Sequence, residues 1–104
     1  MDDAQQRVAD FVARHDLETP PAYRVLDLAS EVGELAKDAN ESTDYGTTPE
    51  DIAINADEIG DVLFAVLALA DALEIDAADA LEESLEKYEQ RLENGGTPGS
   101  NATE

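Results

Sequence analysis

The chain has 104 residues, no cysteine, and a formal charge of −20 from 26 acidic and 6 basic residues. This length suits one small domain, and the lack of cysteine excludes a disulfide framework, a thiolate nucleophile and a zinc–thiolate site. The excess of acids disfavours a nucleic-acid partner, because the phosphate backbone would be repelled.

No targeting or membrane segment is predicted. The N-terminal stretch MDDAQQRVADF lacks the apolar core of a signal peptide. The longest apolar run, residues 62–70, is far shorter than the ~20 residues that span a bilayer. We therefore expect a cytoplasmic protein with no membrane partner. Acids spread over every segment are typical of halophilic proteins, whose surface charges are screened within roughly 3 Å at about 1 M salt.

Helical periodicity and capping signals predict four helices and no strand. The expected helices run from Asp3 to His15, from the start signal Thr19-Pro20-Pro21 to Glu41, from Thr48-Pro49 to Leu73, and from the Asp76 cap to Leu92. The fold class is therefore all-α, a four-helix bundle-type chain in one domain over residues 1–93. Asn94-Gly95-Gly96 should end the last helix, and residues 94–104 are expected to form a disordered polar tail.

The third predicted helix is apolar on every side between Val62 and Ala70. Such a helix needs partners all around it, and three other short helices can hardly surround it. We expect a second copy of the chain to cover the remaining face, giving a homodimer or homotetramer. The alternative is that this helix lies at the centre of a monomeric bundle.

Acidic side chains form a line along one flank of the second predicted helix. They follow the spacing i, i+4, i+7, i+11, and no basic residue interrupts them: Asp27, Glu31, Glu34 and Asp38. Like charges at these spacings destabilise a helix by a few tenths of a kcal/mol each. The line therefore predicts a bound cation.

A matching motif opens the third predicted helix, where Glu58 and Asp61 lead into the apolar segment and an unpaired carboxylate would be costly. Each motif contains a glycine, Gly33 or Gly60, that costs about 1 kcal/mol against alanine. We interpret the glycines as allowing close approach of the two helix backbones. Four carboxylates, Glu31, Glu34, Glu58 and Asp61, would then face one volume and hold Mg²⁺, which prefers carboxylate oxygens. The alternative is a solvated acidic face.

Two cations flank the apolar stripe of the fourth predicted helix. Lys87 and Arg91 lie one turn apart in a chain with six basic residues. Together with a metal held by carboxylates, they suit a polyphosphate ligand. The alternative for Lys87 is an ordinary helix ion pair with Glu83.

These motifs together resemble the MazG-like nucleotide pyrophosphohydrolases of the all-α NTP pyrophosphatase superfamily. The matching stretches are E-x-G-E, EIGDVLFAVLALA and Leu-Glu-Lys-Tyr-x-x-Arg-Leu, and the resemblance covers about residues 3–92. It implies an all-α dimer or tetramer that hydrolyses a nucleoside triphosphate to the monophosphate and pyrophosphate with Mg²⁺, for which Mn²⁺ can substitute.

The resemblance also implies roles for individual residues. The metal ligands would be Glu31, Glu34, Glu58 and Asp61, and the phosphate contacts Lys87 and Arg91. Either Glu34 or Glu31 would accept the proton of the attacking water.

Two alternatives stay open. One is phosphoribosyl-ATP pyrophosphohydrolase of histidine biosynthesis, a member of the same superfamily that would use the same metal site. The other is a non-catalytic acidic helical dimerisation module. The preferred base and sugar are not specified by these motifs.

Overall fold

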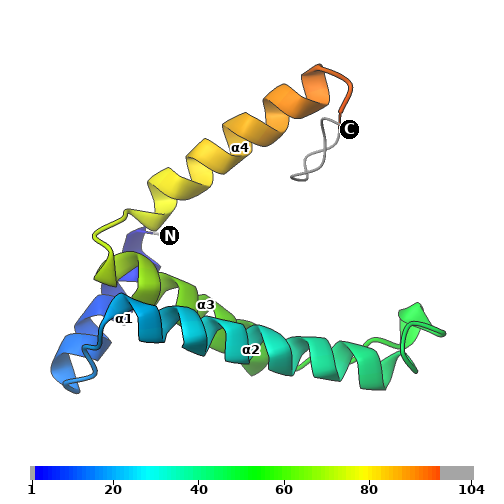
Figure 1. Ribbon diagram of the computed structural model, residues 1–104, viewed down its shortest axis with the longest axis horizontal. Helices are drawn as coiled ribbons and strands as arrows, with labels where there is room; N and C mark the ends of the chain where they lie inside the picture. The colour runs from blue at the N-terminus through cyan, green and yellow to red at the C-terminus, as the bar shows by residue number, and fades with distance from the viewer. Residues whose placement is uncertain (1, 97–104) are drawn as a thin grey trace.

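The computed structural model describes residues 2–96, which form four α-helices and no strand (Figure 1). The helices are α1 (Asp2–Arg14), α2 (Pro21–Ser42), α3 (Ala56–Ala72) and α4 (Ala77–Glu93), with a short 3-10 helix at Pro49–Asp51. The predicted all-α class is confirmed, and most predicted helix ends lie within two residues of the observed ones. No helix in the described range is long and apolar enough to cross a membrane.

The helices α2 and α3 run antiparallel, side by side, and α1 crosses behind them (Figure 1). Their small core consists of Val12 from α1 and Ala65, Leu67 and Ala68 from α3, of which Leu67 is 2% exposed. The ring of Phe64 meets the ring of Phe11 edge-on, with centroids 5.9 Å apart. This core fixes α2 against α3, and so fixes the two acidic motifs relative to one another.

The start of α3 differs from the prediction. Pro49 begins a single 3-10 turn, and the chain then leaves the helical region at Ile52, whose φ and ψ are −53° and 133°. The helix begins after Asn55, whose backbone N–H donates to Oε1 of Glu58 at 3.3 Å. An Asn followed three residues later by Glu is itself a helix-start signal. The predicted start at Thr48 was therefore wrong by one short connection.

The helix α4 projects away from the other three, so one chain alone does not close the predicted four-helix bundle (Figure 1). Asp76 caps it as predicted, accepting hydrogen bonds from the backbone N–H groups of Ala78 and Asp79. On α3, Leu63 and Val66 are more than a third exposed. Burial of α3 on every side therefore stays a prediction that depends on a second copy.

The C-terminal end of α4 matches the prediction. Asn94 follows the last helical residue, and Gly95 adopts a φ of 81°, which favours glycine. The N–H of Gly96 then donates to the carbonyl of Arg91 at 2.8 Å, which closes the helix end. The rest of the predicted disordered tail, residues 97–104, lies outside the described residues.

Candidate functional site

A cavity of about 330 Å³ lies between α2 and α3 and is lined mainly by acids. Its lining consists of Ser30, Glu31, Glu34, Asp38, Glu58 and Asp61. The antiparallel packing of α2 against α3 therefore brings all four predicted carboxylates to one volume, although they come from sequence segments far apart. We call this the carboxylate cavity.

Glu58 is the most constrained of these acids. Its Oε1 accepts the N–H of Asn55, whereas its Oε2 is buried without a hydrogen-bond partner. Two carboxyl groups can share a hydrogen bond only if one of them holds a proton. The proximity of Asp38 in this way raises the pKa of Glu58, and desolvation raises it further. A cation near Oε2 would remove both costs.

The residues of the carboxylate cavity fit a hard divalent cation by their chemistry, since all but Ser30 offer carboxylate oxygens. The orphaned Oε2 of Glu58 supplies a buried acceptor that needs a positive partner. Within residues 3–96, however, no three acidic or histidine side chains already converge as a metal-ligand set. Binding a metal ion here would therefore require side-chain rotation on a backbone that is already in place.

Asp38 is an additional acid of the site. It lies at the end of the acidic line on α2, in the predicted i+7 relation to Glu31, but the line alone did not distinguish it from Asp27. The structure does, because the crossing of α2 and α3 places Asp38 at the cavity and next to Glu58. Only the three-dimensional register of the two helices carries this information.

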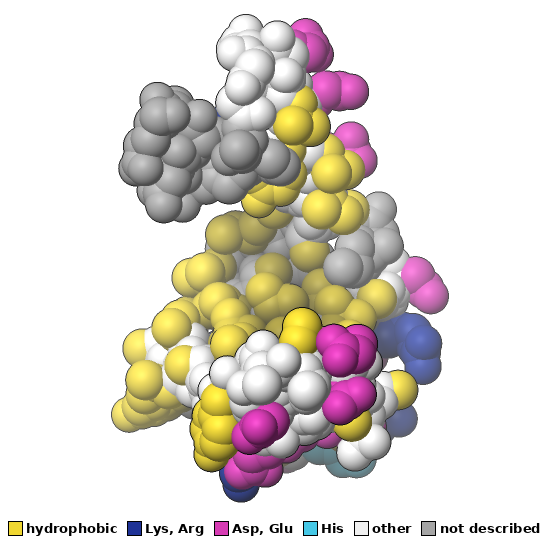
Figure 2. Space-filling model, turned by 90° about the vertical axis from the view of Figure 1, so that its right-hand side faces the viewer, with side chains coloured by type: hydrophobic (Ala, Val, Ile, Leu, Met, Phe, Trp, Pro, Cys, Tyr) yellow, Lys and Arg dark blue, Asp and Glu magenta, His cyan; other side chains and the backbone are white. Residues whose placement is uncertain are grey.

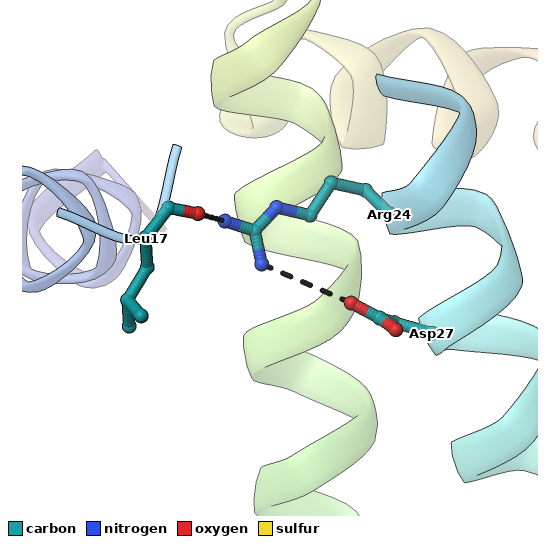
Figure 3. Close-up of polar contacts among 3 residues, drawn as sticks. All are labelled: Leu17, Arg24 and Asp27. Carbon is teal, nitrogen blue, oxygen red and sulfur yellow. Dashed lines mark hydrogen bonds and ion pairs between the residues drawn. The ribbon is translucent and has the colours of Figure 1, made fainter. Parts of the chain in front are cut away.

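Arg24 corrects the prediction that no base accompanies the acidic line. It is 8% exposed, and its Nη1 lies 3.9 Å from Oδ2 of Asp27. Its Nη2 donates to the carbonyl of Leu17 in the α1–α2 connection (Figure 3). An adjoining cavity of about 210 Å³ is lined by Arg24 and shares Glu31 and Asp61 with the carboxylate cavity. A buried cation thus lies beside the acids, one turn before Asp27 in the sequence.

The predicted phosphate-binding cations are not at the carboxylate cavity of their own chain. Lys87 and Arg91 lie on the projecting α4, and neither lines the cavity. The ammonium of Lys87 lies 5.3 Å from the centroid of the Tyr88 ring, and it makes no ion pair with Glu83 within the described residues. The alternative interpretation of Lys87 as a helix ion pair is therefore not supported.

The interpretation of the two glycines was wrong. A Cβ added to Gly33 or Gly60 would meet no atom within 4 Å, so neither glycine is required for the contact of α2 with α3. The helices pack through other residues, among them Ala65 and Ala68, and both glycines lie on exposed faces. The acids converge because of the overall packing of the hairpin.

Comparisons with known proteins agree with this geometry. Residues 21–95 match the family model of the MazG nucleotide pyrophosphohydrolase domain. The chain is 36% identical over 75 residues to the uncharacterized protein YpjD of Bacillus subtilis (strain 168), covering 68% of this chain and 66% of YpjD, just under two thirds of its length. The crystal structure of YpjD, a candidate pyrophosphatase, superposes with a TM-score of 0.70 at 31% identity, covering 85% of this chain and 91% of that one.

Proposed function

The chain belongs to the family of MazG nucleotide pyrophosphohydrolase domains, and from this premise we propose that it hydrolyses nucleoside triphosphates to the monophosphate and pyrophosphate with Mg²⁺. The observation that carries the proposal is the carboxylate cavity, in which Glu31, Glu34, Glu58 and Asp61 from two helices line one volume. Mn²⁺ would substitute for Mg²⁺, because it accepts the same oxygen ligands.

The residues of the cavity divide into two tasks. Glu58 and Asp61, at the start of α3, would hold Mg²⁺ together with Glu31 and Glu34 from α2. The bound metal would supply charge neutralisation at the phosphate oxygens and a more acidic water. One of the α2 carboxylates, Glu34 or Glu31, accepts the proton of that water as its oxygen attacks the α-phosphorus. The bond between the α-phosphorus and the bridging oxygen breaks, and pyrophosphate leaves.

The negative charge of the leaving pyrophosphate calls for cations near the site. Lys87 and Arg91 are proposed for this role, but both belong to the projecting α4. The proposal therefore includes a homodimer or homotetramer, in which α4 of one copy serves the site of another. Arg24, which lines the adjoining cavity, is the basic residue within reach of the acids in the same chain.

Pyrophosphate release from a panel of nucleotides tests the proposal. The panel contains standard and damaged ribo- and deoxyribonucleoside triphosphates and phosphoribosyl-ATP, assayed with Mg²⁺ at high KCl. We expect Mg²⁺-dependent release from at least one nucleoside triphosphate, abolished by a chelator. Release from phosphoribosyl-ATP alone would instead support the histidine-biosynthesis activity. An absence of release from every nucleotide, by a folded protein, would leave the non-catalytic module as the better account.

A further inference from the structure

The helix α4 has an apolar stripe with no partner in its own chain. The stripe residues Leu81, Leu85, Tyr88 and Leu92 are between 37% and 57% exposed. Figure 2 shows hydrophobic side chains along α4 and over the surface beneath it, where α4 meets the rest of the molecule. An isolated helix of this length is marginal in water, and amphipathic helices owe most of their stability to packing. A partner surface is therefore missing.

The corner before α4 holds the helix in its projecting direction. Glu74 adopts a φ of 57° between α3 and α4. The side-chain amide of Gln5 on α1 then binds both sides of the corner: Nε2 donates to the carbonyl of Ile75 at 2.7 Å, and Oε1 accepts the N–H of Ala77 at 2.8 Å. With its first turn tied to α1 in this way, α4 leads away from the α2–α3 hairpin, and its partner must come from outside the chain.

A surface able to receive a helix lies between α1 and α3. This groove encloses about 640 Å³, and its apolar lining includes Phe11 and Leu63, which are 42% and 38% exposed. Gly60 also lines it, and the space above Gly60 is open. A glycine at this position leaves room for a close approach by another backbone. We call this surface the α1–α3 groove.

The charges of the two surfaces are complementary. The α1–α3 groove is lined by Arg7 and Arg14, two of the six basic residues of the chain, with Asp10 as its one acid. The facing partner, α4, carries six acids against two bases; the acids are Asp79, Glu82, Glu83, Glu86, Glu89 and Glu93. In a chain of charge −20, few other surfaces could accept an acidic helix without repulsion.

We propose that two copies of the chain form a two-fold dimer in which α4 of each copy lies in the α1–α3 groove of the other. The exchange is reciprocal and closed, so it buries both stripes and both grooves and leaves no open end for further growth. It also covers Leu63 on α3, one of the residues that a single chain leaves exposed.

The exchange has a consequence for the site, and this part rests on the proposed function. Gly60, in the groove, directly precedes Asp61, in the carboxylate cavity. A partner helix in the groove is thus a neighbour of that cavity, and it carries Lys87. The basic side chain that is distant from the acids of its own chain would serve those of the other copy.

Cross-linking between singly substituted chains tests the exchange, because the natural chain contains no cysteine to interfere. Leu85→Cys chains are mixed with Leu63→Cys chains and treated with a short bismaleimide. Val32→Cys, an equally exposed apolar position on α2 outside the groove, replaces Leu63→Cys as the matched control. We expect a cross-linked dimer with Leu63→Cys and little with Val32→Cys. Equal yields, or a monomeric wild type by light scattering, would overturn the exchange.

Charge reversal tests the complementarity. Arg7→Glu with Arg14→Glu should weaken dimerisation at least tenfold at the lowest salt at which the chain is folded, since salt screens such pairs. Adding Glu86→Lys and Glu89→Lys in the same chain should restore the dimer. A dimer unaffected by the first pair of substitutions would show that α4 does not lie in this groove.

Subunit mixing separates the interface from the chemistry. Glu58→Gln and Lys87→Ala chains, each with low pyrophosphate release, should together regain about a quarter of wild-type activity, because half of the random dimers contain one intact site. No recovery, in chains that cross-link as expected, would overturn the delivery of Lys87 to the partner and leave the interface standing. An inactive wild type that still cross-links would refute the proposed function alone.

Discussion

The α2–α3 hairpin and α4 bury their apolar faces in different ways. The hairpin covers part of its own surface, with Ala65, Leu67 and Ala68 packed inside the chain, whereas the α4 stripe around Leu85 stays exposed. The acids belong to the self-sufficient part and Lys87 to the dependent part. The difference teaches that one chain can position the metal-binding half of the site, while its cationic half depends on what α4 packs against.

The largest expected effect concerns the core of the hairpin. Leu67→Ala should lower the free energy of unfolding by about 2–5 kcal/mol, because Leu67 is fully buried and its truncation leaves a cavity. Leu85→Ala, on α4, should lower stability through the dimer, so its effect should fall at low protein concentration. Urea unfolding at several protein concentrations measures both. An effect of Leu85→Ala that is large and independent of concentration would contradict the contrast.

The next effect concerns catalysis. Glu58→Gln should lower pyrophosphate release at least about a hundredfold, equivalent to about 2.7 kcal/mol in the barrier. Its folding should change little, because glutamine can still accept the N–H of Asn55. Asp57→Asn removes the same charge one residue earlier, outside the carboxylate cavity, and is the matched control. Full turnover by Glu58→Gln would mean that the cavity is not the active site.

A smaller effect is expected at the glycines. Gly33→Ala should stabilise the chain by about 1 kcal/mol, since the added methyl group meets open space and alanine favours the helix. Gly60→Ala should give the same gain in a monomer, but less in a dimer whose partner helix covers Gly60. Thermal unfolding of the two variants at matched concentrations checks this. Equal gains at every concentration would argue against a helix in the groove.

The smallest effect is a pH dependence of the chelator-treated protein. The raised pKa of Glu58 means that the folded state holds more protons than the unfolded state in the range above the ordinary value of 4.5. The contribution of Glu58 to stability should therefore decrease as the pH rises through that raised pKa. Asp38→Asn removes the main cause and should flatten this dependence. Unfolding measured from pH 4.5 towards neutrality tests the sign, and an unchanged slope would exclude Asp38 as the cause.

The sequence was sufficient to predict the all-α class, the helix ends and the residues that meet in the carboxylate cavity. Periodicity and caps are local properties, and the Asp76 cap and the Gly95 helix end are correspondingly correct. The start of α3 was missed because two start signals follow one another, at Thr48 and at Asn55. The second one wins, since Glu58 reaches back to the Asn55 N–H.

Other features depend on three-dimensional register and could not be predicted from local patterns. The direction of α4 follows from the corner at Glu74 and from its bonds to Gln5, some seventy residues away in sequence. The role of Arg24 depends on where the carbonyl of Leu17 lies after the chain turns. The glycines were misinterpreted because spacing alone does not show which face of a helix meets its neighbour.

Glu58 has one further consequence, because its two oxygens perform different tasks. Oε1 holds the amide of Asn55 at the end of α3, while Oε2 faces the acids without a partner. Whatever engages Oε2 also restrains Oε1, so fraying of the first turn of α3 and occupancy of the cavity form one equilibrium. Deuterium uptake at the Asn55 amide should slow as a divalent cation is added, which turns a helix end into a reporter of ligand binding.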